Sequence, residues 1–172
     1  TLERFFSQNY YYLFTTSLYQ SKYIAKDGIE RNTIYNNNYA FNFLIGKEFV
    51  NIGKKQNKTF GINAKLLYVG ARKIIPLLRD EKGELAVNPA KGLYYDYTKA
   101  YEKGLDDVFQ VNASASLKIN KAKLTHEIAV DVINANNTKA HIDEYYNPKE
   151  KDKIGYYTPM SLIPNLVYRV KF

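Results

Sequence analysis

The chain has 172 residues, with 25 Lys and Arg against 17 Asp and Glu, so its net charge is +8. It contains 17 Tyr and 9 Phe but no Cys, which excludes disulfides, thiolate metal ligands and a cysteine nucleophile. No segment approaches the roughly 18 consecutive apolar residues of a transmembrane helix, although membrane-spanning strands would leave a much weaker hydropathy signal.

Apolar and polar residues alternate with period two along most of the sequence, which predicts β-strands because successive side chains of a strand point to opposite faces. The clearest run extends from Phe109 to Asn120, where apolar residues alternate with small polar ones. We expect Thr1–Asn9 to be a turn before the first strand and Tyr97–Lys103 to form a helical turn in the longest loop. In chain order, the predicted strands are 10–21, 38–50, 59–71, 108–120, 123–136 and 160–172.

The connections between these strands alternate in length. Asn51–Lys58 and Asn120–Lys123 are short, whereas Ser21–Asn37, Arg72–Asp107 and Asn137–Pro159 are long, polar and punctuated by Gly, Pro and Asn. The predicted strands, of about 11–13 residues, exceed the ~5–6 residues of an average soluble strand and reach the ~9–11 that a tilted strand needs to cross a bilayer. Long strands joined by alternately short turns and long loops are typical of outer-membrane barrels.

The sequence therefore predicts an all-β fold, an antiparallel up-and-down transmembrane β-barrel to which this chain contributes about six strands. The apolar faces would meet lipid, with aromatic residues such as Phe60 and Phe109 near the strand ends, and the polar faces would line the lumen. Alternation alone does not say which face is inside. A small soluble β-barrel or sandwich that binds a lipophilic ligand in an apolar interior is the alternative.

Four residues are candidates for the lumen wall: Ser114, Lys118, Glu127 and Asp131. We expect Glu127 and Asp131 to pair with basic residues of neighbouring strands, such as Lys118 or Lys65, because opposite charges on facing strand positions attract. The functional alternative is that these charges steer a substrate or contact a domain inside the barrel.

The long loops carry four candidate ligand contacts, Tyr94, Tyr95, Tyr97 and His141. The tyrosines could stack on a ligand such as a sugar, or they could pack the loop against the barrel rim. His141 and Asp143 would share one side of an extended segment, where a metal or metal chelate could bind. Two ligands from one loop make a poor closed site, so the sequence predicts neither a metal centre nor a cofactor.

No catalytic constellation is present, and we do not expect an enzyme. The His126–Glu127 pair lacks the second histidine of a zinc-protease motif, because position 130 is Val, and we expect His126 to be an interface residue. No phosphate loop or nucleophile with its base is recognisable. The basic residues are dispersed, and clusters such as Lys54–Lys55 favour solvated turns over a nucleic-acid-binding surface.

The end of the chain resembles the C-terminal β-signal that the barrel assembly machinery of bacterial outer membranes reads. Phe172 is the last residue, and Val170 and Tyr168 precede it at every second position. The chain as a whole, residues 1–172, resembles the C-terminal part of a TonB-dependent outer-membrane receptor. The segments that carry the resemblance are Leu2–Phe6, Thr16–Tyr23, Asp27–Thr33, Gly46–Phe49, Tyr68–Arg72, Thr125–Glu127 and Tyr168–Phe172.

This resemblance implies a barrel of about 22 strands with a plugged lumen, in the outer membrane of a Gram-negative bacterium, with the C-terminus at the periplasmic side. The chain would supply barrel wall, lumen lining and extracellular loops for active uptake of a nutrient such as a metal chelate, oligosaccharide or peptide. The implied partners are outer-membrane lipids, the N-terminal remainder of the barrel with its plug domain, the barrel assembly machinery, and TonB through parts outside this chain. Some members of the family carry a surface lipoprotein lid, and the sequence leaves that partner open.

Overall fold

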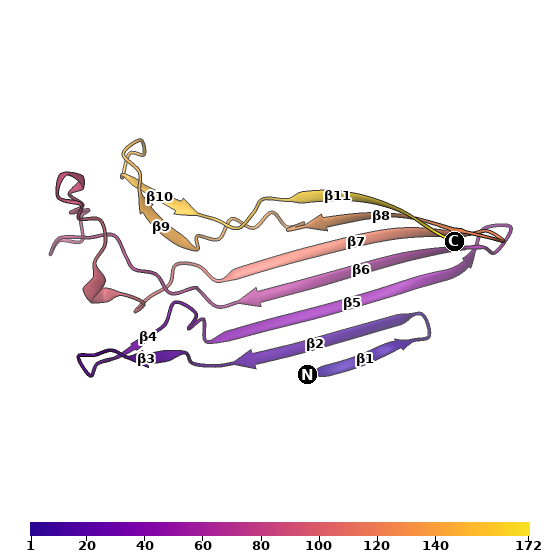
Figure 1. Cartoon of the computed structure of the whole chain (residues 1–172), viewed down its shortest axis with the longest axis horizontal. Helices are drawn as coiled ribbons and strands as arrows, with labels where there is room; N and C mark the ends of the chain where they lie inside the picture. Colours follow the sequence, from indigo (N-terminus) through magenta and orange to yellow (C-terminus); the bar gives the residue numbers. More distant parts are fainter.

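The structure, a computed structural model, describes all 172 residues and consists of one long antiparallel β-sheet with loops at one end (Figure 1). Seven strands lie in the order β1-β2-β5-β6-β7-β8-β11, and every neighbouring pair is antiparallel. The prediction of an all-β antiparallel fold is confirmed. The strands are β1 (Leu2–Ser7), β2 (Tyr10–Leu18), β5 (Tyr39–Ile52), β6 (Lys58–Val69), β7 (Val108–Asn120), β8 (Thr125–Ile133) and β11 (Ile163–Lys171).

Short turns gather at one end of the sheet and long loops at the other, as the sequence predicted (Figure 1). We call the end with the turns after β1, β5 and β7 the short-turn end, and the opposite end the long-loop end. The long-loop end holds two small hairpins, β3 (Lys22–Ile24) with β4 (Glu30–Asn32) and β9 (Asp143–Tyr146) with β10 (Ile154–Tyr157). The sequence pattern did not predict these hairpins.

Two short 3-10 turns are the only helical elements, η1 (Pro89–Lys91) and η2 (Tyr97–Lys99). The helical turn expected over Tyr97–Lys103 is present but ends at Lys99. Asp96 caps it, because its side chain accepts a hydrogen bond from the Thr98 N–H at 3.1 Å. Neither helical element has the length and hydrophobicity that crossing a bilayer would require.

The expectation that Thr1–Asn9 is a turn is wrong, because Leu2–Ser7 forms an additional strand. Leu2 lies opposite Phe14, and Ser7 lies opposite Tyr10. The two residues between these strands, Gln8 and Asn9, have φ angles of 53° and 66°. Two consecutive left-handed residues are the geometry of a type I′ hairpin turn, which Asn favours. The sheet therefore has seven strands rather than six.

The sheet is a single layer and encloses no hydrophobic core. Only 11 of 172 residues are buried, and the apolar ones are Ile74, Leu77 and Ala129. Ile74 and Leu77 belong to the loop between β6 and β7 rather than to the sheet. The edge strands β1 and β11 do not pair with each other, so this chain alone closes no barrel. Both faces of the sheet are consequently open for contact with other molecules.

Candidate functional site: the two faces of the sheet and the loop cluster

The four predicted lumen residues lie on one face of the sheet, which we call the polar face. Residues directly opposite each other in an antiparallel pair project to the same side. Lys118 lies opposite Glu127, and Ser114 lies opposite Asp131 on β8 and Asn63 on β6. Ser114, Lys118, Glu127 and Asp131 therefore share one face of the sheet.

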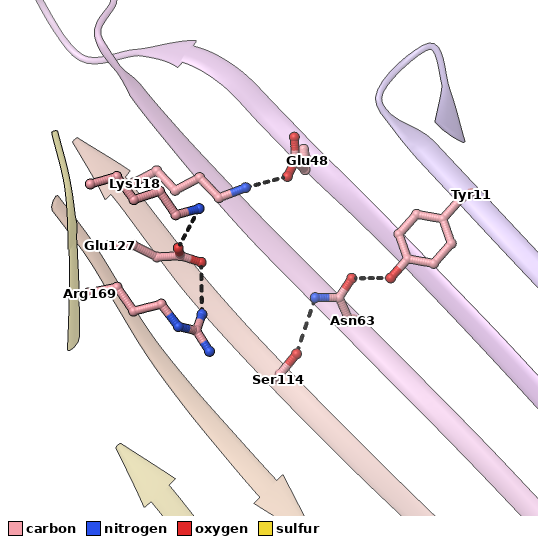
Figure 2. A network of polar contacts seen from close by, with 8 residues as sticks. Tyr11, Glu48, Asn63, Ser114, Lys118, Glu127 and Arg169 are labelled. Carbon is pink, nitrogen blue, oxygen red and sulfur yellow. Dashed lines mark hydrogen bonds and ion pairs between the residues drawn. The ribbon is translucent and has the colours of Figure 1, made fainter. Parts of the chain in front are cut away.

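A chain of hydrogen bonds joins β2, β6 and β7 on the polar face and passes over β5 (Figure 2). The Tyr11 hydroxyl donates to Asn63 Oδ1 at 2.8 Å, and Asn63 Nδ2 donates to Ser114 Oγ at 3.1 Å. Gly46 lies between Tyr11 and Asn63 in the register. A Cβ at Gly46 would collide with both the Tyr11 ring and Asn63 Oδ1, so glycine lets the tyrosine lie flat across β5.

Ion pairs on the polar face join strands near the short-turn end (Figure 2). Glu127, which is 8 % exposed, accepts from Arg169 at 3.5 Å and lies 3.5 Å from Lys171 Nζ. Lys118 reaches across β6 to Glu48 at 2.9 Å. The expectation that Glu127 pairs with basic residues of a neighbouring strand is confirmed, because Arg169 and Lys171 belong to β11, but Lys118 as its partner is wrong. Gly61, which lies opposite Glu48, has no side chain to fill the space between them, so Lys118 can reach the more distant carboxylate.

The expectation that Asp131 pairs with a neighbouring basic residue is also wrong. No Lys or Arg nitrogen lies within 4.0 Å of its carboxylate. Asp131 and Lys65 instead line a recess of about 190 Å³ on the polar face, together with Asn63, Asn112 and Ser114. The polar face thus offers one carboxylate and one ammonium group to whatever occupies that recess.

The opposite, apolar face carries aromatic clusters at both ends. At the long-loop end, Tyr39 and Phe41 pack against Tyr68, with ring centroids 5.6 and 6.3 Å apart, and Phe109 packs on Tyr68 at 6.5 Å. The Tyr39 and Tyr68 hydroxyls both donate to the Asp107 carboxylate, and these hydrogen bonds, the Tyr39 bond foremost, lower the pKa of Asp107 below its usual value.

At the short-turn end of the apolar face, Phe49 stacks on Phe60 with centroids 6.2 Å apart. His126 lies 2.8 Å from the Tyr168 hydroxyl through Nδ1, and the two rings stack. The three residues that resemble a β-signal, Tyr168, Val170 and Phe172, are 61 %, 39 % and 101 % exposed. Because β11 is an edge strand, these side chains and one backbone edge are accessible together.

Two of the predicted loop residues, Tyr95 and Tyr97, come together at the long-loop end. Their rings meet edge to face at 6.5 Å, and both line a cavity of about 180 Å³ with Tyr101 and Tyr157. Burial raises the pKa of the Tyr95 hydroxyl, and the nearby Asp143 carboxylate adds to this effect. The cavity is formed where the β6–β7 loop contacts the β9–β10 hairpin and Ile34 of the β4–β5 connection, so three distant segments of the sequence build it.

Glu144 holds that contact together, and sequence reasoning missed it. Its carboxylate is 4 % exposed, accepts from the Leu77 N–H at 2.7 Å and pairs with Arg79 at 3.2 Å. A larger cavity of about 430 Å³ adjoins Glu144 and Arg79 and is lined by Lys99 and Lys103 as well. Nothing local in the sequence distinguishes Glu144 from the other carboxylates of a polar loop.

Tyr94 and His141 lie apart from the Tyr95–Tyr97 cavity. The Tyr94 ring packs on Tyr146 at 6.2 Å. His141 Nδ1 lies 3.0 Å from Asp106 Oδ2, and its ring packs on Tyr156 at 4.3 Å. No hydrogen bond or ion pair joins His141 to Asp143, and the loop places Asp106 beside the imidazole. No group of three or more His, Asp or Glu side chains is arranged to hold a metal ion.

No family model, curated protein sequence or solved structure matches this chain.

Proposed function

We propose that this chain forms part of the wall of a TonB-dependent outer-membrane receptor. In this proposal the apolar face meets lipid, the polar face lines the lumen, and the loops at the long-loop end face the exterior. Strands from the remainder of the protein pair with the free edges of β1 and β11, because unpaired backbone groups are not tolerated at hydrocarbon depth. The loops and the recess beside Asp131 would contact the nutrient on its way in.

The single observation that carries the proposal is the long, exposed apolar face of β6, β7 and β8. On β6, β7 and β8, this face carries no charged side chain between the two aromatic clusters. Phe60 and Tyr68 are eight residues apart on β6, which is about 27 Å at ~3.4 Å per residue. With a strand tilt of about 40° the height is about 21 Å, close to the ~25 Å apolar band of outer-membrane barrels.

The polar face supports the same proposal. Near the short-turn end, several of its charges are engaged in pairs such as Glu48–Lys118, and its centre is occupied by the Tyr11–Asn63–Ser114 hydrogen bonds. A soluble sheet would need to cover the apolar face with a second layer. In this chain no second layer is present, and side chains such as Val130 and Ile128 are 44 % exposed.

Single cysteines in the intact protein test the topology, because this chain contains none. Lys151→Cys lies in the loop between β9 and β10, and Lys55→Cys lies in the turn between β5 and β6; both lysines are exposed. A membrane-impermeant maleimide should label the Lys151→Cys protein on whole cells. It should label the Lys55→Cys protein only after the outer membrane has been permeabilised. Equal labelling of both on intact cells would refute the topology.

The same protein tests the TonB and β-signal assignments. The purified intact protein should bind the periplasmic domain of TonB, and failure to bind would contradict the receptor assignment while leaving the wall topology standing. Changing Tyr168 and Phe172 to Ala should lower the amount of protein in the outer membrane, because the assembly machinery would lose its signal. Wild-type surface levels in that double variant would count against the β-signal.

A further inference from the structure

The excess positive charge of the chain is concentrated at the short-turn end. This end carries ten Lys and Arg against three Glu, an excess of seven. The long-loop end carries 14 Lys and Arg against 13 Asp and Glu, which is nearly neutral. The short-turn end comprises the segments 1–10, 46–61, 116–127 and 169–172. The long-loop end comprises the segments 19–38, 70–107 and 134–162.

Six lysines of the short-turn end have no carboxylate partner. All six are exposed, and no carboxylate oxygen lies within 4.0 Å of any of them. By contrast, the cations on the polar face at this end, Lys118, Arg169 and Lys171, are engaged by Glu48 and Glu127. We call the unpaired set the basic rim: Lys47, Lys54, Lys55, Lys58, Lys121 and Lys123.

Two lysines of the basic rim, Lys47 and Lys58, lie on the apolar face, and the other four lie in the turns at the same end of the sheet. Lys58 lies opposite Ile119, and Lys47 lies opposite Tyr10, the first residue after the β1–β2 turn. The Lys47 ammonium is 5.2 Å from the centroid of the Phe49 ring. A lysine at the edge of an apolar surface can lay its aliphatic stem along that surface and extend its charge beyond it. The rim cations therefore lie where acyl chains would give way to headgroups.

The other end of the apolar face has the opposite character. There the aromatic cluster terminates in the Asp107 carboxylate, which the hydroxyls of Tyr39 and Tyr68 contact. An acidic group at one border and unpaired lysines at the other make the two borders electrostatically distinct. Headgroups of negative charge would be attracted more strongly to the short-turn border.

We propose that the basic rim binds anionic phospholipid headgroups, such as those of phosphatidylglycerol, in the leaflet that contacts the short-turn end. This inference rests on the proposed function, because it requires the apolar face to meet acyl chains. An acidic protein is the competing occupant. Lipid is favoured because Lys47 and Lys58 of the rim lie on the face that would meet acyl chains, whereas the polar-face cations at this end, Lys118, Arg169 and Lys171, are already engaged by carboxylates.

Spin-labelled lipids test the proposal on the intact protein reconstituted in vesicles of phosphatidylethanolamine with a minority of phosphatidylglycerol. The native protein should restrict the motion of labelled phosphatidylglycerol about twofold to fivefold more than that of labelled phosphatidylethanolamine. The upper value corresponds to the attraction between one basic residue and an anionic lipid surface. High salt should reduce the preference, because it screens exposed charges.

Two matched variants locate the effect. The first changes four turn lysines of the rim to Gln, at Lys54, Lys55, Lys121 and Lys123, and should bring the preference close to one. The control changes four exposed, unpaired lysines of the long-loop end to Gln and should keep the native preference. The control positions are Lys82, Lys91, Lys149 and Lys151.

Each contrary result has a distinct meaning. An inserted protein without any lipid preference, or a control variant that loses the preference equally, would overturn the inference and leave the proposed function intact. Copurification of an acidic protein that only the rim variant releases, without lipid preference, would overturn it in favour of a protein partner. A protein that restricts neither labelled lipid is not inserted, and this result would overturn the proposed function together with the inference.

Discussion

The facing of the sheet can be tested by placing an arginine at the same depth on either face. Ser114 is the central residue of β7, and Val130 is adjacent to the centre of β8. Ser114 lies on the polar face opposite Asp131, whereas Val130 lies on the apolar face opposite Ala115 and Leu166. Substitution of either residue by Arg adds the same side chain at nearly the same height.

The magnitude of the expected difference follows from the environment of each site. An arginine on the lipid face near the middle of a bilayer costs about 2–4 kcal/mol, which corresponds to about 30-fold to 700-fold in the folding equilibrium constant. Ser114→Arg should cost far less, because its guanidinium remains on the polar face within reach of the unpaired Asp131 carboxylate. Val130→Leu controls for the change of shape alone and should cost less than about 1.5 kcal/mol.

Reversible denaturant unfolding of the intact protein in lipid vesicles measures these differences. Val130→Arg should shift the unfolding midpoint to lower denaturant, whereas Ser114→Arg should stay near the native midpoint. If Ser114→Arg is as destabilising as Val130→Arg, or more so, the assignment of the two faces is wrong. A Val130→Leu variant as unstable as Val130→Arg would show that shape, rather than charge in lipid, causes the loss.

Three further predictions concern local contacts. Gly46→Ala should cost about 1–3 kcal/mol in unfolding free energy, because the added methyl group collides with neighbouring side chains. Gly61→Ala is the control and should cost less, because its Cβ comes close only to the Ser116 hydroxyl, at 2.9 Å, which can rotate away. Glu144→Ala should cost about 1–3 kcal/mol by leaving a buried backbone N–H unpaired, and limited proteolysis should then cut the β6–β7 loop faster. A hydrogen bond from Arg31 lowers the pKa of Asp27 to about 2 from 3.8. This contact therefore stabilises the β3–β4 hairpin above pH 3.8, and its contribution is lost as the pH falls through about 2. The titration midpoint of Asp27, followed by NMR, should return towards 3.8 in Arg31→Gln.

The free edges of the sheet explain why strand prediction failed at the N-terminus and succeeded elsewhere. Leu2–Ser7 lacks regular alternation, and it is a strand because β2 offers a backbone edge to pair with after a two-residue turn. Its signal lies in the neighbouring strand rather than in its own sequence. The β9–β10 hairpin was missed because its strands are likewise defined by each other. Gly155 of β10 allows the Tyr145 ring of β9 to lie across it.

The sequence also did not predict which charged side chains form ion pairs with each other. Lys118 lies directly opposite Glu127, yet it pairs with Glu48 two strands away, while Glu127 takes Arg169 and Lys171. That choice depends on strand order, on the reach of a long side chain and on the missing side chain at Gly61. Strand order and the position of Gly61 between the two charged groups cannot be read from residues that are neighbours in the chain.

The sequence by itself determined the six longest strands, their antiparallel arrangement, the division into a polar and an apolar face, and the separation of short turns from long loops. These features follow from period-two alternation and turn residues, which act over a few positions along the chain. Only the tertiary structure decided the seventh strand, the exchange of ion-pair partners and the meeting of Glu144 with Leu77 and Arg79. Those features depend on register and on contacts between segments far apart in sequence, which a local pattern does not encode.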